Sequence, residues 1–184
     1  MLHPQILLSE NVYWIGVNDR RTHLFENYWP LPFGVAYNSY LIVDEKVTLM
    51  DTVSMGTMDT FLEKIKEILN GRPIDYLVIN HMEPDHSGAV RAVVNEYPEV
   101  KIIGNAKTFP MLEGFYGIHD NLIEVEEGSM LNTGRHTFHF YMTPMVHWPE
   151  TMMTYDSADK ILYSADAFGS VGTLDGGIFD DEIN

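Results

Sequence analysis

Four side chains that bind metal ions in proteins fall within six consecutive residues of this sequence: His81, Glu83, Asp85 and His86. They follow directly on residues 74–80, an apolar run that predicts a buried strand. A strand that ends in such a loop presents ligands from a rigid edge, which is the geometry that a metal site needs. The alternative is a polar loop with its charges in water, and four such residues in six positions favour the metal site.

The spacing within this loop indicates two binding positions rather than one. In an extended backbone, His81 and Glu83 project to the same side. Pro84 then turns the chain, so that Asp85 and His86 point to a second position nearby. One short loop is therefore expected to serve two metal ions.

Two later segments bring further metal ligands to the ends of predicted strands. His147 follows the alternating segment 136–142, and Asp166 follows the short strand expected at 161–164. Three strand ends that each carry a metal-binding group are harder to explain by chance than any one of them.

The elements that position these groups predict an α/β fold with helices outside the sheets. The clearest helix is 58–70, which Gly71 ends and in which Phe61 and Ile65 share one face. Asp51 ends the strand expected at 47–50, where its carboxylate either braces the ligand loop or caps a turn. Further strands are expected at 11–17, 37–43, 74–80, 101–104, 122–125 and 152–155, and further helices at 87–97, capped by Ser87, and at 106–116.

The composition limits the possible functions. A chain of 184 residues is long enough for one domain with a core, and its net charge of −16 would repel nucleic acid. No run of 18 apolar residues predicts a membrane span. Because cysteine is absent, any metal must bind imidazole and carboxylate groups. We see no secretory signal in residues 1–5 and expect a cytoplasmic protein.

Four motifs of the sequence are similar to those of one family. They are 81–88 (HMEPDHSG), 147–152 (HWPETM), 166–169 (DAFG) and 172–177 (GTLDGG). They resemble the metallo-β-lactamase fold and, more closely, the diiron domain of flavodiiron proteins, also known as A-type flavoproteins. The resemblance covers nearly all of residues 1–184 and implies a metallo-β-lactamase-like αββα sandwich.

Carried over by position, the resemblance implies a ligand set for two iron ions. His81, Glu83 and His147 hold the first iron, Asp85 and His86 hold the second, and Asp166 bridges them. Zinc hydrolases of this fold usually have histidine where Glu83 stands. A carboxylate adds negative charge and a hard oxygen donor, and both favour iron, above all its ferric state.

The resemblance also implies an activity, further cofactors and partners. Flavodiiron proteins reduce dioxygen to water or nitric oxide to nitrous oxide with electrons from FMN. The FMN receives these electrons from a donor such as rubredoxin, an F420-type partner, or another flavin or iron protein. Their FMN lies near the diiron site of a partner subunit, which implies a head-to-tail homodimer. This chain has neither a flavodoxin-like FMN domain nor a histidine after His147 for the second iron, so we expect a domain truncated at its C-terminus.

Two other interpretations remain open at this point. The chain could be a zinc-dependent hydrolase of the metallo-β-lactamase fold, or an inactive fragment that lacks the last metal ligand. His23, Tyr28 and Trp148 are candidates for pocket residues or for side chains that support the ligands. His119, His136 and His139 are interpreted as structural or surface residues, because positions 136 and 139 face opposite sides of a strand.

Overall fold

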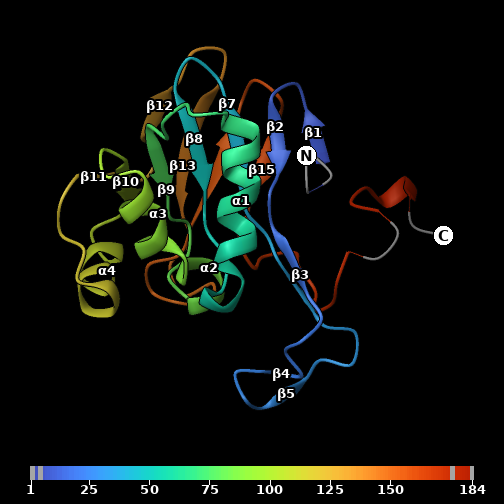
Figure 1. Ribbon diagram of the computed structural model, residues 1–184. Helices are drawn as coiled ribbons and strands as arrows, with labels where there is room; N and C mark the ends of the chain where they lie inside the picture. The colour runs from blue at the N-terminus through green and yellow to red at the C-terminus, as the bar shows by residue number, and fades with distance from the viewer. Residues whose placement is uncertain (1–2, 4–5, 175–176, 183–184) are drawn as a thin grey trace.

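The computed structural model describes residues 3, 6–174 and 177–182 (Figure 1). Within them the chain forms a seven-stranded sheet, a four-stranded sheet and four α-helices, which confirms the predicted α/β class. The expectations placed on residues 1, 2, 4 and 5 and on Asp175 and Gly176 lie outside the described residues. In the part of the chain that is described, no helix has the length and apolar character needed to cross a bilayer.

The seven-stranded sheet joins an antiparallel half to a parallel half. The strands β8 to β11 run parallel to one another, whereas β1, β2, β7 and β8 pair antiparallel. The carboxyl ends of β8, β9 and β10 therefore meet at one edge, where the ligand loop begins. In sheet order, the strands are β1 (Ile6–Ser9), β2 (Val12–Trp14), β7 (Tyr40–Val43), β8 (Val47–Met50), β9 (Tyr76–Val78), β10 (Lys101–Gly104) and β11 (Leu122–Glu124).

The second sheet is antiparallel throughout, and its last two strands carry the later motifs to the same edge. Its strands are β12 (Met130–Asn132), β13 (Thr137–Met142), β14 (Met152–Asp156) and β15 (Ile161–Tyr163). The helices are η1 (Met55–Thr57), α1 (Met58–Leu69), α2 (Pro84–Ser87), α3 (Val90–Glu96), α4 (Thr108–Tyr116) and η2 (Asp180–Glu182).

Two apolar cores lie on the two faces of the seven-stranded sheet. On β9 and β10, Leu77 and Ile102 face one core, and Val78 and Ile103 face the other, because successive side chains of a strand alternate between faces. The helices α1, α3 and α4 cover the first face, and the four-stranded sheet covers the second (Figure 1). A register slip of one residue would exchange the two cores, so the register that positions the ligand loop is strongly determined.

No described helix covers the outer face of the four-stranded sheet, in agreement with the expectation of an incomplete αββα sandwich. The described helices α1, α3 and α4 pack on the other sheet, and Met130, Tyr141 and Leu162 on this face are 67%, 42% and 45% exposed. The described residues thus form three of the four expected layers.

A short arm, which the sequence analysis did not predict, projects from the body of the fold (Figure 1). It consists of β4 (Leu24–Phe25) and β5 (Trp29–Pro30), and it is connected to the body by the antiparallel pair β3 (Val17–Asp19) and β6 (Val35–Tyr37). Tyr28 and Trp29 on this arm are 83% and 61% exposed.

Helix α1 begins at Met58 as its apolar pattern predicts and ends at Leu69, one residue before the predicted end. Its buried face can be tested directly. Phe61 is fully buried in the first core. We expect Phe61→Ala to lower the free energy of unfolding by about 3–5 kcal/mol, through lost apolar burial and the cavity left behind. Met55→Ala, at a side chain that is 62% exposed, should change it by less than about 0.5 kcal/mol. Urea unfolding followed by circular dichroism measures both, and equal effects would contradict this packing.

Candidate metal centre

The ligand loop is braced from behind by Asp51, as one of the two sequence-based interpretations expected. Asp51 lies just after β8 in the left-handed region, with φ of 53°, and is 5% exposed. Its carboxylate accepts hydrogen bonds from the backbone N–H of Asn80, at 2.7 Å, and from the Asn80 side-chain amide, at 2.9 Å. Thr154 on β14 donates to Asn80 Oδ1 at 2.7 Å, so the start of the loop is fixed from both sheets.

After His81 the chain makes a single helical turn, α2, which begins at Pro84 and carries Asp85 and His86. The sequence analysis assigned Ser87 as the cap of a helix over 87–97, and this is wrong. Ser87 is fully buried inside α2, where its hydroxyl donates to backbone carbonyls of the ligand loop and contacts the Tyr116 hydroxyl. The structure thus has two short helices, α2 and α3, because Ser87 ties α2 to α4 instead of starting a longer helix.

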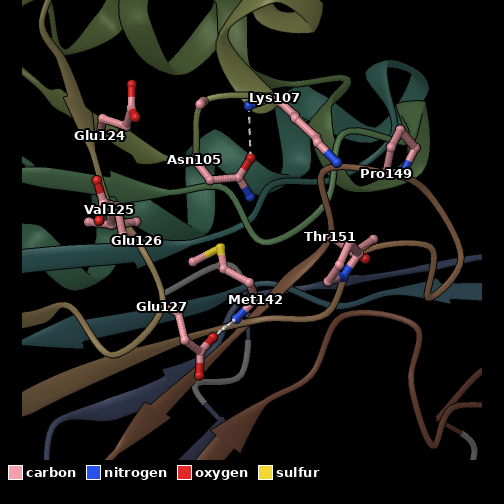
Figure 2. Close-up of a pocket in the computed structure, with 11 residues that line it drawn as sticks. Asn105, Lys107, Glu124, Val125, Glu126, Glu127, Met142, Pro149 and Thr151 are labelled. Carbon is pink, nitrogen blue, oxygen red and sulfur yellow. Dashed lines mark hydrogen bonds between the residues drawn. The ribbon is translucent and has the colours of Figure 1, made fainter.

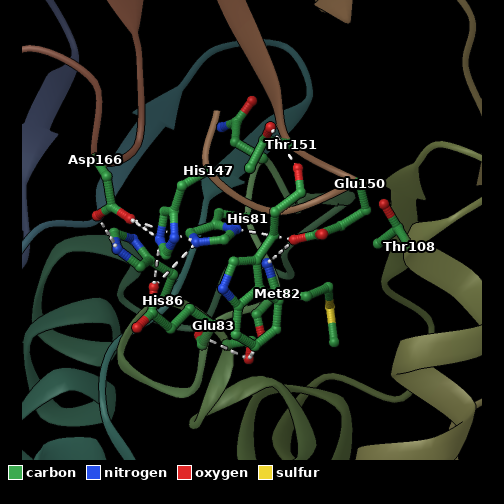
Figure 3. Close-up of polar contacts among 12 residues, drawn as sticks. His81, Met82, Glu83, His86, Thr108, His147, Glu150, Thr151 and Asp166 are labelled. Carbon is green, nitrogen blue, oxygen red and sulfur yellow. Dashed lines mark hydrogen bonds and ion pairs between the residues drawn. The ribbon is translucent and has the colours of Figure 1, made fainter. Parts of the chain in front are cut away.

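The structure brings together all six side chains that the sequence identified. Figure 3 labels His81, Glu83, His86, His147 and Asp166 among them. Two groups of potential ligand atoms have all their members within 4.8 Å of one another. The first group is His81, Glu83, His147 and Asp166, and the second is Asp85, His86 and Asp166.

The first group is centred on two carboxylates and two imidazoles. Glu83 Oε2 lies 3.2 Å from Nε2 of His81 and 2.9 Å from Nε2 of His147. Asp166 Oδ2 lies 3.4 Å and 3.3 Å from the same two nitrogens. The two Nε2 atoms and two oxygens therefore converge on one position. His81 is fully buried, whereas the His147 side chain is 56% exposed.

Asp166 belongs to both groups because its two oxygens face different imidazoles. Oδ2 faces the first group, and Oδ1 lies 2.6 Å from Nε2 of His86. Ala165, directly before it, has φ of 49°, a left-handed conformation that an alanine rarely adopts. Such strain is found mainly where a functional group must be aimed. This orientation is the one that a carboxylate bridging two cations requires.

Protons bind tightly to the imidazoles of His81 and His86. Burial lowers the pKa of His81, but hydrogen bonds with Asp166, Glu150 and Glu83 outweigh burial and raise that pKa to about 11. Burial likewise lowers the pKa of His86, whereas its contacts with carboxylates raise it to about 9. Positive charge is thus stabilised at the point where the carboxylates converge.

The carboxylates respond to the same contacts. Burial raises the pKa of Asp166, but its hydrogen bonds with His81 and His86 hold it far below the usual range. The hydrogen bond with His81 lowers the pKa of Glu83, against burial. Asp85 differs, because burial raises its pKa. A cation near Asp85 would remove the cost of burying its charge.

The residues present fit a pair of hard or borderline metal ions. Nitrogen and carboxylate oxygen donors suit iron, zinc and manganese. Oδ1 of Asp85 is buried and has no hydrogen-bond partner among the described residues, although Oδ2 lies 3.5 Å from His86. A buried carboxylate oxygen that accepts no hydrogen bond is free to bind a metal ion.

The sequence analysis missed the contribution of Glu150, which lies between β13 and β14. Glu150 is 1% exposed, and its Oε1 accepts hydrogen bonds from His81 Nδ1, at 2.8 Å, and from the N–H of Met82, at 2.9 Å. Burial raises the pKa of Glu150, but these bonds hold it below the usual range, so Glu150 accepts and His81 donates. The only sequence signal for Glu150 is its place in the motif at 147–152, because a single glutamate in a loop has no spacing pattern that indicates a supporting role.

Of the three candidate supporting residues, the structure brings only Trp148 to the centre. The Trp148 ring meets the His81 ring edge-on, with 5.4 Å between the ring centroids. His23 and Tyr28 lie on the exposed arm and are not among the residues that line the cavity at the centre, so their role as pocket residues stays a prediction. Phe25 on the same arm lines that cavity of about 240 Å³ together with His147 and Asp166.

The other histidines are structural or surface residues, as the sequence analysis expected. His119 is exposed, and His139 is half-buried on the four-stranded sheet. His136 is buried, and its Nδ1 lies 2.7 Å from Asp156 Oδ2. Asp159 completes a third group of potential ligands with this pair, but Asp159 already forms an ion pair with Arg135. We therefore interpret this group as a structural network.

A second cavity, of about 270 Å³, lies on the other side of the loop 149–151 (Figure 2). Met142, Pro149 and Thr151 line it on one side and Asn105 on the other. The Asn105 amide donates to the backbone carbonyl of Glu150 at 2.6 Å, so this wall supports the loop that reaches the metal centre.

Removing the brace behind the loop should weaken the fold. We expect Asp51→Leu to lower the free energy of unfolding by about 2–5 kcal/mol, because two buried donors of Asn80 lose their acceptor. Asp51→Asn keeps an acceptor oxygen and tolerates the positive φ, so it should cost less than about 2 kcal/mol. Urea unfolding in the presence of a chelator measures both. Equal losses for the two variants would contradict the bracing role.

The fold and the centre together define a class of protein. An α/β sandwich that brings histidines and carboxylates from a strand-end loop and two later loops to one sheet edge is a metallo-β-lactamase-like domain. The model of the family described as "ODP family beta lactamase" matches residues 35–182, and the chain belongs to that family.

Known proteins agree with this assignment. The chain is 34% identical over 166 residues to a nitric oxide reductase of Moorella thermoacetica, covering 89% of this chain and 42% of the relative. The structure of rubredoxin oxygen:oxidoreductase from Desulfovibrio gigas matches with a TM-score of 0.92 and 32% identity, over 98% of this chain and 45% of that chain. The flavodiiron protein of Giardia intestinalis matches with a TM-score of 0.90 and 29% identity, over 95% and 43%. The chain thus spans about two fifths of the length of the curated relatives that it matches.

Proposed function

We propose that this chain is the diiron module of an oxidoreductase that reduces dioxygen to water, nitric oxide to nitrous oxide, or both. The observation that carries the proposal is the pair of ligand groups that share Asp166, with a carboxylate at position 83. The matched relatives named as reductases of nitric oxide and oxygen support it.

The proposed ligands follow the two groups. His81, Glu83 and His147 hold the first iron, and Asp85 and His86 hold the second. Asp166 would contribute to both positions, which its two oxygens, each facing a different imidazole, support. A pair of ferrous ions at these residues would supply electrons to a diatomic substrate.

The protein side chains contribute charge, position and a shielded space. Glu83 and Asp166 place negative charge on the first ion, which stabilises its ferric state. Trp148 covers the edge of His81 and limits water at that ligand. The cavity beside His147 is bounded by Phe25 and is large enough for a diatomic molecule.

The proposed partners extend beyond this chain. In the whole protein, FMN bound by a separate flavodoxin-like domain would deliver electrons, and rubredoxin or a similar flavin or iron protein would reduce it. We also propose a head-to-tail homodimer, because large apolar side chains are exposed on the surface: Trp29 on the arm is 61% exposed, and Phe168, two residues after Asp166, is 89% exposed. Sedimentation of the purified chain and of a Trp29→Glu variant tests this, since the variant should sediment as a monomer. A cytoplasmic location belongs to the same proposal.

Metal analysis and gas consumption test the proposed activity. Protein produced without added zinc should contain close to two iron ions per chain. After anaerobic purification, the protein should consume added nitric oxide or added dioxygen when a chemical electron donor is present. Stoichiometric zinc with hydrolysis of a thioester or lactam would establish the hydrolase instead, an alternative that the reductase relatives do not favour. Little bound iron and no gas consumption would identify an inactive fragment.

A further inference from the structure

Glu150 is a buried carboxylate that belongs to neither group of potential metal ligands. It is 1% exposed, and its Oε2 is buried without a hydrogen-bond partner among the described residues. Burying a charged group in this way is costly unless its remaining contacts are strong. The contacts of its other oxygen, Oε1, therefore have to account for its presence.

Oε1 of Glu150 fixes both the ring and the backbone of one ligand segment. It accepts from His81 Nδ1 at 2.8 Å and from the N–H of Met82 at 2.9 Å. With a proton held on Nδ1, the lone pair for a metal belongs to Nε2. That nitrogen faces Glu83 Oε2 at 3.2 Å and Asp166 Oδ2 at 3.4 Å. Glu150 thus determines which nitrogen of His81 faces the first metal position.

Within the two groups of described ligand residues, only a histidine of the first metal position has a carboxylate on its Nδ1. Among the three histidines of the two groups, as far as the described residues show, His81 alone has a carboxylate on Nδ1. The contacts of His86 and His147 with carboxylates are made by Nε2. The same loop that carries Glu150 also carries His147, a ligand of the first group, so one segment positions two of its imidazoles.

The loop itself is held in place from the side opposite the metal centre. Asn105, which follows β10, donates from its amide to the Glu150 backbone carbonyl at 2.6 Å. Asn105 also lines the second cavity, with Pro149 and Thr151 of the loop (Figure 2). Glu150 is therefore fixed at its backbone by one sheet edge and at its side chain by the ligand loop.

We propose that Glu150 is a positioning residue of the first metal position, which fixes the Nδ1–H form and the orientation of His81. The proposal rests on the proposed function only in requiring that a metal ion binds His81. It holds for iron or zinc alike, because both bind imidazole through the nitrogen that carries no proton.

The chain offers a matched control for the test. His136 and Asp156 form a second buried histidine–carboxylate pair, with 2.7 Å between Nδ1 and Oδ2, on the four-stranded sheet. Asp156→Leu removes a buried carboxylate from an imidazole in the same way as Glu150→Leu, but outside the six-residue centre. The comparison separates positioning of the ligand from general loss of stability.

The first measurement is the Zn²⁺ affinity of a single position, by competition with a chromophoric chelator. His86→Ala removes the second group, so that one ion is titrated. In this background we expect Glu150→Leu to lower the affinity about 10- to 100-fold. Glu150→Gln, which keeps an acceptor oxygen, should lose less than about tenfold, and Asp156→Leu should lose less than about threefold.

The second measurement is the imidazole N–H spectrum of the Zn²⁺-loaded, ¹⁵N-histidine-labelled protein. Two slowly exchanging Nδ1–H signals are expected, from His81 and His136. Glu150→Leu should remove the first alone and Asp156→Leu the second alone, while Glu150→Gln should retain both. If Glu150→Leu does not fold, Glu150→Asp, which is one methylene shorter, takes its place with the same expected losses.

Two results would overturn the proposal. One is an unchanged affinity and an unchanged His81 signal in Glu150→Leu. The other is an equal loss of affinity in Glu150→Leu and Asp156→Leu, which would indicate general destabilisation. Zinc in place of iron in the isolated protein would refute the proposed reductase but leave these comparisons intact, so the two failures can be told apart.

Discussion

Replacing Asp166 by alanine is expected to empty both metal positions, because Asp166 is the one side chain that both groups share. Iron content should fall from close to two ions to fewer than about 0.5 per chain, and nitric oxide or dioxygen consumption should fall more than about 100-fold. Each ion would lose the Asp166 carboxylate as a ligand, and no negative charge would remain between the two cations. Inductively coupled plasma mass spectrometry and gas-electrode assays measure the two effects.

Asp159→Ala is the control for Asp166→Ala. Asp159 is also a carboxylate that contacts a basic side chain, Arg135, but it lies outside both groups of the centre. We expect this variant to keep its iron and its activity. If Asp166→Ala retained two tightly bound ions, Asp166 would not be a bridge and the two positions would be independent.

Replacing Glu83 by histidine should change which metal the first position selects. An imidazole removes one negative charge and one hard oxygen donor, and both changes favour zinc over iron and weaken the ferric state. In medium with equal iron and zinc, we expect the iron-to-zinc ratio at this position to fall about tenfold or more, with a comparable loss of reductase activity. Metal analysis of parallel preparations measures the ratio.

Glu83→Asp retains the charge and the oxygen donor, so it should bind iron more weakly without a new preference for zinc. The pair of variants separates ligand chemistry from ligand geometry. Should Glu83→His remain loaded with iron and fully active, the carboxylate at position 83 would have no part in metal selection.

The grouping of the candidate ligand side chains was predicted from the sequence in more detail than the arm and the loops around it. His81, Glu83, Asp85 and His86 were visible because four reactive side chains followed a buried strand at short spacing. His147 and Asp166 were visible because each follows a predicted strand, the alternating segment 136–142 and the short strand 161–164. Close spacing after a strand restricts where side chains can point, and the structure brings these groups together.

The residues that the sequence analysis missed or misplaced share a different property. Glu150 lies far from His81 in sequence, so only the packing of the two sheets brings them together. His23 and Tyr28 lie on an arm that the sequence did not predict, so their role near the site stays a prediction. Ser87 looked like a helix cap, yet its hydroxyl is used inside the fold. Contacts between segments that are distant in sequence decide the roles of Glu150 and Ser87.

Anomalous X-ray diffraction from crystals of the anaerobically purified protein tests the central claim most directly. Data collected on either side of the iron and zinc absorption edges should reveal two iron atoms about 3–4 Å apart, one against His81, Glu83 and His147 and the other against Asp85 and His86, with Asp166 between them. A single zinc peak, or two metals that do not share Asp166, would contradict the account.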